Sequence, residues 1–172
     1  MALDDSGKVY GCGFNRYKML AYDEYYTLCP QHITCLENIY YIKCGICGTL
    51  SINNSGKLIF NGIYIIDVKE KIIKVTKPYY NFVNTNFLAL SYCGNVYEIV
   101  IKQDFQHNVL ETKINKLNIY NIKDIHSHDD KSYIIIDNNN TLYVKGFNGY
   151  GQLGINSTKS VYDFMSHPYL TM

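Results

Sequence analysis

Nine residues near the carboxyl end of the chain read Gly146-Phe147-Asn148-Gly149-Tyr150-Gly151-Gln152-Leu153-Gly154. They follow a short β-forming run, Thr141-Leu142-Tyr143-Val144. Gly151 and Gly154 suit positive φ or close backbone approach. The amides of Asn148 and Gln152 have donors and acceptors for backbone groups that a connection leaves unpaired. The segment therefore predicts an ordered connection after a strand, with an architectural rather than a chemical role.

The strand and turn before this segment recur along the chain. The four aligned stretches are 3–15, 52–62, 90–100 and 136–148. In each, an apolar run ends in a polar turn such as Asp-Asp-Ser-Gly or Asn-Asn-Ser-Gly, whose residues tolerate positive φ. The turn positions Gly7, Gly56, Gly94 and Asn140 are 49, 38 and 46 residues apart. That is the spacing of propeller blades, roughly 40 to 50 residues each.

Repeated hairpins predict one all-β domain. A single hairpin is marginal in water, so the units must stack their faces, as four-stranded blades around an axis do. No intervening segment has the pattern of a long amphipathic helix. We expect a single domain over 1–172 with repeat units of about 1–50, 51–93, 94–139 and 140–172.

The motif at 146–154 resembles the signature Gly-x-Asn-x-x-Gly-Gln-Leu-Gly of the regulator of chromosome condensation repeat family. An eroded copy begins at Gly13, and a segment around Gly45 is similar to the family's Cys-Gly-x-x-His-Thr-x-x-Leu, with Gly48 in place of the His. The residues assigned to the signature are Gly7, Gly13, Asn15, Gly45, Gly56, Gly62, Gly146, Asn148, Gly151, Gln152, Leu153 and Gly154.

The chain also departs from that pattern. The family's Trp before the glycine is replaced by Cys12, Asn61 and Lys145, and Val100 stands where the third unit should have its final glycine. The resemblance implies a β-propeller. Through the family's founding member it also implies guanine-nucleotide exchange on a small GTPase, with chromatin attachment.

The number of units is small for a closed propeller. Closure takes roughly four to eight blades, the family typically has seven, and 172 residues at this spacing give about four. Three arrangements remain open: a small closed propeller in which the first hairpin completes the blade begun at Gly146, an open half that pairs with another chain, and a truncated relic. Because an open arc exposes apolar faces and strand edges, we expect an incomplete or open propeller that a partner stabilises.

Charge and composition narrow the partners. The chain has 16 basic and 15 acidic residues, a net charge of +1, which lacks the basic excess typical of direct nucleic-acid binding. No apolar run approaches the roughly 20 residues of a membrane span, and the first residues do not read as a signal peptide. The sequence has 18 Tyr and no Trp, with many Asn, Ile and Lys, a bias typical of an AT-rich protist or of a large virus infecting one. We expect an intracellular protein, cytoplasmic or nuclear, or a virion component if viral.

The cysteines and lysines have structural interpretations. Cys44 and Cys47 have the spacing of zinc and redox pairs, but Cys29 and Cys35 do not supply a matching second pair, and no helix follows. We expect free thiols, and neither a metal nor a cofactor. The lysines between positions 69 and 77 alternate with apolar residues, which predicts an exposed row that protects a strand edge.

The best candidate for a partner contact is the polar group His126, His128, Asp129 and Asp130. Such residues can bind metal or transfer protons, but a solvated loop before a strand is the simpler interpretation. We therefore expect no enzyme, but a non-catalytic interaction scaffold or structural assembly component, bound to another protein or to a second copy. The alternative function is the exchange factor that the family resemblance implies.

Overall fold

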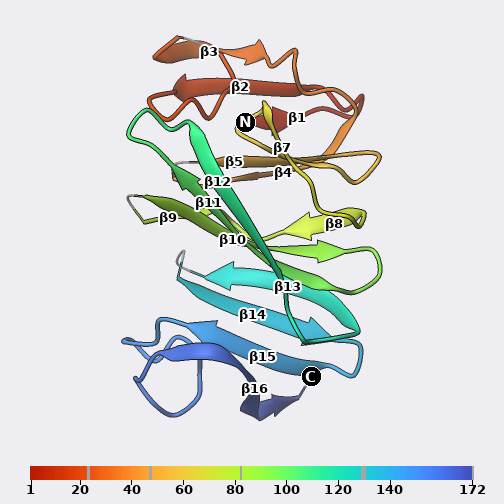
Figure 1. Ribbon diagram of the computed structural model, residues 1–172, viewed down its shortest axis with the longest axis vertical. Coiled ribbons are helices and arrows are strands. Elements are labelled where there is room, and N and C mark those ends of the chain that lie inside the picture. Colours follow the sequence, from red (N-terminus) through yellow and green to blue (C-terminus); the bar gives the residue numbers. More distant parts are fainter. Residues whose placement is uncertain (23, 47, 82, 129–130, 172) are drawn as a thin grey trace.

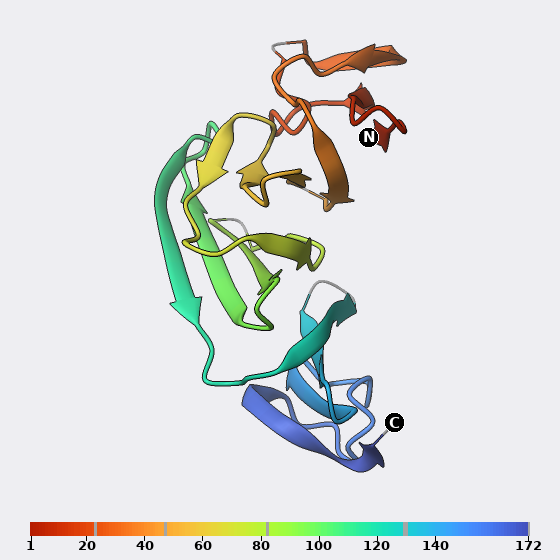
Figure 2. The same cartoon turned by 90° about the vertical axis from the view of Figure 1, so that its right-hand side faces the viewer.

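The computed structural model describes residues 1–22, 24–46, 48–81, 83–128 and 131–171. Four antiparallel sheets are stacked along the chain, and the described part contains no helix, which confirms the all-β prediction. Figure 1 shows the sheets one below another from the N-terminal to the C-terminal end, and Figure 2 shows that the stack bends into an arc. Each sheet is a blade.

The four blades follow chain order. Blade 1 consists of β1 (Ala2–Leu3), β2 (Val9–Phe14) and β3 (Tyr26–His32). Blade 2 consists of β4 (Ile39–Cys44), β5 (Thr49–Asn53), β6 (Leu58–Phe60) and β7 (Tyr64–Ile66). Blade 3 has β8 (Ile72–Val75), β10 (Asn84–Ser91), β11 (Val96–Gln103) and β12 (Val109–Lys116), with the short β9 (Tyr79–Tyr80) paired to β10. Blade 4 has β13 (Ile122–His128), β14 (Ser132–Asp137), β15 (Thr141–Gly146) and β16 (Val161–Thr171).

The core lies between the blades rather than within them. On β10, Phe87 and Ala89 pack toward blade 2, whereas Leu88 and Leu90 pack toward blade 4. All four are buried because alternate side chains of the strand face opposite neighbours. This two-sided burial explains why the central strands read as continuous apolar runs. The N-terminal interface, between blades 1 and 2, is a smaller cluster around Val9, Ile33 and Ile39.

The same backbone contact joins each blade to the next. The carbonyl of a glycine in the central hairpin turn accepts a hydrogen bond from the first residue of the following blade's first strand. The three pairs are Gly7 with Ile39 (3.1 Å), Gly56 with Ile72 (3.0 Å) and Gly94 with Ile122 (3.1 Å). We call this contact the turn hook. It places the first strands β4, β8 and β13 at equivalent positions, on the concave side of the arc in Figure 2.

The arc is open. Blade 4 has its own fourth strand, β16, and no strand of blade 1 pairs with blade 4 in the described part of the chain. The closed arrangement completed by the first hairpin is therefore not formed. The sheets also divide the chain at other places than the repeat units do, since unit 1–50 ends inside β5. A repeat measured from turn to turn straddles two blades, because the turn lies in the middle of each blade.

No helix in the described residues is long and apolar enough to cross a membrane.

Candidate partner-binding groove on the concave side

The first strands of blades 2 to 4 line a groove of about 450 Å³. β4, β8 and β13 each stand at an edge of their sheet. Their outer backbone groups therefore face the axis of the arc rather than another strand of the same blade. The groove lining includes Tyr41, Lys43, Lys74, Lys77 and His126.

Two neighbouring tyrosines tie β4 to β8. The hydroxyl of Tyr40 donates to the carbonyl of Ile72 at 2.8 Å, and that of Tyr41 donates to the carbonyl of Val75 at 3.2 Å. Burial raises the pKa of both tyrosines, so both stay neutral donors near neutral pH. These bonds satisfy edge carbonyls of β8 and fix the wall of the groove.

An ion pair ties β8 to β13. Lys74 Nζ lies 2.5 Å from Asp124 Oδ1, with about a third of each side chain exposed (30% and 33%). Asp124 Oδ2 also lies 3.0 Å from His126 Nε2. Burial raises the pKa of Asp124, but the hydrogen bond from Lys74, the Ile125 amide and the nearby His126 together lower it. Asp124 therefore stays charged and committed to its two partners.

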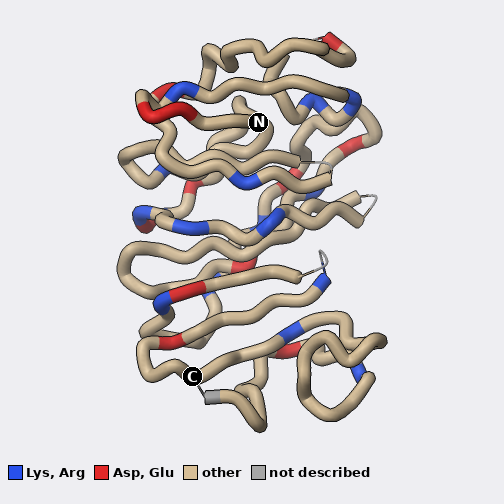
Figure 3. The backbone as a smooth tube through the Cα atoms, turned by 180° about the vertical axis from the view of Figure 1, so that it is seen from behind, with Lys and Arg blue, Asp and Glu red and all other residues tan. Residues whose placement is uncertain are grey.

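The groove lining is basic although the whole chain is nearly neutral. The residues that line it in the described structure include three lysines and one histidine and no carboxylic acid, although Asp124 pairs with two of them, Lys74 and His126. Elsewhere acidic and basic positions are interspersed over the blades (Figure 3). The side chain of His126 is 51% exposed, so it is open to a ligand while it contacts Asp124. The arrangement favours an acidic group over a basic one.

The structure corrects the prediction of a polar loop. His126 and His128 lie in β13, where they pair with Ile134 and Ser132 of β14, and are not in a loop. The buried Ile122 and Ile125 hold this segment in the sheet, which the cluster of polar residues concealed. Asp129 and Asp130 lie outside the described residues. The described residues contain no group of three or more His, Cys, Asp or Glu side chains that could hold a metal ion.

The cysteine and lysine predictions have mixed outcomes. Cys44, at the end of β4, has an exposed free thiol. Cys12, Cys29, Cys35 and Cys93 also have exposed free thiols, and Cys47 lies outside the described residues. Of the lysine row only Lys74 lies within the edge strand β8, and it is partly buried in an ion pair with Asp124 rather than fully exposed.

The signature residues are distributed through the fold and are not brought together at one site. Gly7 and Gly56 lie in hairpin turns, Gly45 and Gly62 just after strands, and Gly13 and Gly146 within strand ends. Gly151, Gln152, the buried Leu153 and Gly154 form the connection between β15 and β16. None of them lines the groove.

Asn15 and Asn148 make equivalent contacts in their connections. Asn148 Nδ2 donates to the carbonyls of Ser157 (2.7 Å) and Lys159 (3.2 Å), and its Oδ1 accepts from the Leu153 amide (2.8 Å). The corresponding partners of Asn15 are the carbonyls of Tyr22 and Glu24 and the amide of Leu20. The eroded first copy of the motif therefore keeps its hydrogen bonds.

Sequence reasoning did not find Lys43 or Asp124. The usable signal was position: each groove strand lies a short distance before the apolar strand of a predicted hairpin. Reading the segment at 126–130 as a loop concealed the residues of β13 that face the axis.

Comparisons with known proteins establish the fold. No protein-family model matches the sequence, and no curated protein matches it. The structure is similar to Prp20p from Saccharomyces cerevisiae, with a TM-score of 0.74, 15% identity, and coverage of 96% of this chain and 47% of that one. It is similar to human WBSCR16, with a TM-score of 0.73, 15% identity, and coverage of 96% and 49%.

The chain thus spans about half the length of each of these structures. At 15% identity the similarity shows the fold alone. Both neighbours are propellers of the type whose signature was identified at 146–154, and that motif and the stacked four-stranded sheets agree with them. The chain has the β-propeller fold of the regulator of chromosome condensation type, as an open arc of four blades.

Proposed function

We propose that this chain is a non-catalytic scaffold whose concave groove binds an acidic segment of another protein. The observation that carries the proposal is the groove itself, which is formed by three equivalent edge strands and lined by lysines and a histidine. Edge strands offer an extended segment those backbone donors and acceptors that the turn hooks and the two tyrosines do not already occupy. The basic side chains select for acidic residues in that segment.

The charged groups near the groove support binding rather than chemistry. Asp124 joins two blades through Lys74, so it holds the wall and is not poised as a general base. Tyr41, whose pKa is raised by burial, is likewise a structural donor. A fixed basic wall of this kind positions a partner without reacting with it.

A labelled peptide of glutamates tests the proposal directly. We expect it to bind the purified chain, measured by fluorescence anisotropy, and a matched peptide of lysines not to bind. Lys43→Glu places a like charge in the groove and should weaken binding by about fivefold or more, because the partner charge is then repelled. Lys113→Glu, on the exposed strand β12, is the matched control and should bind like the parent.

Equal binding of the two peptides, or equal effects of Lys43→Glu and Lys113→Glu, would contradict the groove as the binding surface. Repeating the binding measurement at increasing salt concentration adds a second check. The affinity for the glutamate peptide should fall, because salt screens the attraction between opposite charges.

A second candidate function is guanine-nucleotide exchange on a small GTPase with chromatin association. Its support is the fold likeness to Prp20p, which is described as binding Gsp1p and histones. Release of a fluorescent nucleotide from a small GTPase separates the two candidates. A scaffold leaves the release rate unchanged, whereas an exchange factor raises it in proportion to its concentration.

A further inference from the structure

The hairpin of β11 and β12 reaches beyond its own blade. In Figure 1 its turn lies beside the connections of blade 1, having passed blade 2. The hydroxyl groups of Tyr64 on β7 and Thr112 on β12 lie 3.1 Å apart. At the tip, the rings of His107 and Tyr17 meet edge to face with centroids 4.6 Å apart. Blades 1, 2 and 3 therefore meet at one place, remote in sequence and separate from the groove residues.

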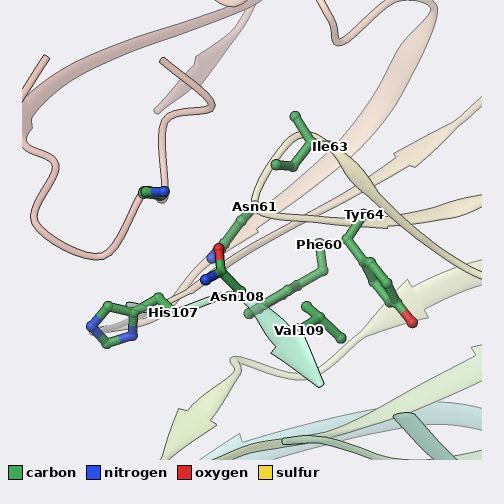
Figure 4. Close-up of a pocket in the computed structure, with 8 residues that line it drawn as sticks. Phe60, Asn61, Ile63, Tyr64, His107, Asn108 and Val109 are labelled. Carbon is green, nitrogen blue, oxygen red and sulfur yellow. The ribbon is translucent and has the colours of Figure 1, made fainter. Parts of the chain in front are cut away.

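Two adjoining cavities open there. The first, of about 240 Å³, has an apolar wall of Phe60, Ile63, Tyr64 and Val109 (Figure 4). The second, of about 570 Å³, is more open and is lined by Arg16, Tyr17, Tyr80 and Phe105, among others. Lys18 and His107 line both cavities, so the apolar pocket has a basic, aromatic entrance.

Lys18 occupies a backbone position that suits glycine. Its amide donates to the carbonyl of Asn15, as the amide of Gly151 donates to that of Asn148 in the equivalent turn of blade 4. The φ angles are 51° at Lys18 and 72° at Gly151, both in the left-handed region. A side chain with a Cβ is disfavoured there. The backbone of Lys18 is therefore strained, and its ammonium group lies at the entrance of the cavities. Such strain is typical of functional positions.

His107 occupies a second left-handed position, with φ 63°, in a turn that is held from several sides. Asp104 Oδ1 accepts from the amides of Gln106 and Asn108, both at 2.8 Å. The buried Gln103 donates from Nε2 to the carbonyl of His107 at 3.1 Å. The imidazole Nδ1 is buried and has no hydrogen-bond partner among the described residues. The turn is thus preorganised, and the Nδ1 atom of His107 remains able to form a hydrogen bond with a ligand.

The charges and exposed rings indicate what fits. Arg16 and Lys18 bring positive charge, while Asp104 is occupied by the backbone of its own turn and by the Asn108 side chain. Burial chiefly lowers the pKa of His107; the nearby Asp104 opposes this shift, and Arg16 and Lys18 lower the pKa further. Phe105, at the tip of the turn, is 100% exposed. A fully exposed ring on a rigid turn, beside an apolar pocket, is typical of a contact surface.

We infer that this site binds a short peptide segment of a partner protein in which one large apolar side chain stands next to acidic residues. The apolar side chain occupies the pocket of Phe60, Tyr64 and Val109, and the carboxylates contact Arg16 and Lys18. Phe105 packs over the bound segment. The inference goes beyond the groove function and does not rest on it, because the two surfaces share no lining residue.

The absence of Trp from the chain provides the assay. The probe is the capped tripeptide Ac-Glu-Trp-Glu-NH₂. Its indole fluorescence can be recorded without a contribution from tryptophan in the protein. We expect its emission to shift to shorter wavelength on saturable binding. Ac-Lys-Trp-Lys-NH₂ tests the charge requirement and Ac-Glu-Ala-Glu-NH₂, used as a competitor, tests the apolar anchor. Both should be at least about fivefold weaker.

Lys18→Gly separates binding from folding. Glycine suits the left-handed φ, so the unfolding midpoint should stay the same or rise, while the affinity for Ac-Glu-Trp-Glu-NH₂ falls about three- to fivefold. Phe105→Ala removes a fully exposed ring and should also weaken binding without loss of fold. Lys113→Ala, on β12 outside both cavities, controls for the loss of one positive charge.

The groove variant Lys43→Glu completes the design. It should leave tripeptide binding unchanged, so failure of one surface can be told from failure of the other. The inference is overturned if Lys18→Gly and Phe105→Ala bind the tripeptide like the parent, or if the lysine tripeptide binds equally well.

Discussion

Asn148 and Asn15 show how a single amide organises a whole connection. Each side chain donates to two carbonyls and accepts from one amide, and all the partners are backbone groups of the loop that follows. Both residues are buried, so an unmade bond is not replaced by water. The connection therefore depends on the asparagine more than on the glycines around it.

Asn148→Ala should lower the free energy of unfolding by about 2 to 3 kcal/mol, because three backbone groups then lose their buried partner. Gln152→Ala is the matched control from the same motif. Gln152 accepts a single bond, from the Tyr150 amide at an exposed site, so its loss should cost less than about 1 kcal/mol. Urea denaturation of both variants measures the difference, and equal losses would refute the assigned role of Asn148.

Glu70 makes stability depend on pH. Hydrogen bonds from Asn95, then Ser91 and Tyr97, hold its pKa at about 2, below the ordinary value of 4.5. Because the pKa is lower in the folded state, the charged form of Glu70 stabilises the fold. This stabilisation is complete at pH values above 4.5 and is lost as the pH falls toward 2. Glu70→Gln should therefore cost about 1 to 2 kcal/mol at neutral pH, and parent and variant should converge in acid. Glu111→Gln, at an exposed ion pair, should follow the parent at every pH.

At the scale of the element, the central hairpin both builds its blade and joins the next one. The turn glycine must have positive φ and must also leave room for the following strand. At Gly56, with φ 81°, an added Cβ would lie 2.2 Å from Lys71 Cγ and 3.0 Å from Lys71 Cα. The Cα belongs to the backbone, so it cannot turn aside as a side-chain end would. A side chain at position 56 would therefore have two separate costs, the left-handed φ and the steric conflict with Lys71.

Gly56→Ala and Gly151→Ala separate those costs. An added Cβ at Gly151, with φ 72°, has nothing within 4 Å, so this change measures the cost of φ alone, about 1 kcal/mol. Gly56→Ala adds the steric conflict and disturbs the hook to Ile72, and should cost about 2 to 4 kcal/mol. Thermal and urea unfolding give both values. A smaller loss at Gly56 than at Gly151 would show that the hook is not under steric control.

The hairpins were predictable because turn chemistry and apolar runs are local signals. The same signals located the third blade, although Val100 replaces the final glycine of its motif. The edge strands were not predictable in the same way. β13 contains His126, Ser127 and His128, and only its pairing with β14 and its buried isoleucines make it a strand. The cavities between blades depend on contacts such as that of Tyr17 with His107, which lie far apart in sequence.

At the scale of the whole molecule, the open arc leaves two end blades with one uncovered face each. Blade 1 exposes Tyr26 and Leu28 on β3, and blade 4 exposes Tyr162, Tyr169 and Leu170 on β16. In the described chain blade 1 has three strands, and none corresponds to β4, β8 or β13. Apolar ends and an unfilled sheet edge favour association.

We therefore expect the mass in solution to rise with concentration in a light-scattering dilution series. Replacing Leu28 and Tyr162 by Lys should suppress the association, since a charge then stands on each uncovered face. The pair Leu110 and Tyr120, also exposed but in blade 3 and just after it, provides the control. A parent chain that stays monomeric over the whole series would contradict association through the ends.

The stacking of blades also sets the order in which the molecule opens. Because each blade packs chiefly on its neighbours, with the contact of Tyr17 in blade 1 and His107 in blade 3 as an addition, stability is largely a sum of interface contributions, and the middle blades have two interfaces. The largest buried cluster joins blades 2 and 3, whereas blade 1 is held by a much smaller one. Nearly all residues of β3 are exposed, and so are most of those of β16. Local opening should start at both ends of the arc.

Hydrogen exchange followed by mass spectrometry tests this order. Peptides covering 26–32 and 161–170 should exchange first, and those covering 87–90 and 99–101 last, since Phe87, Leu88, Ile99 and Ile101 are fully buried between blades. Leu50→Ala, within the cluster between blades 2 and 3, should speed exchange throughout both blades, because they share that interface. Val9→Ala should speed it in blade 1 and at the start of blade 2 only. Uniform protection over all four blades would mean that the arc opens as one cooperative unit, and the picture of additive interfaces would have to be abandoned.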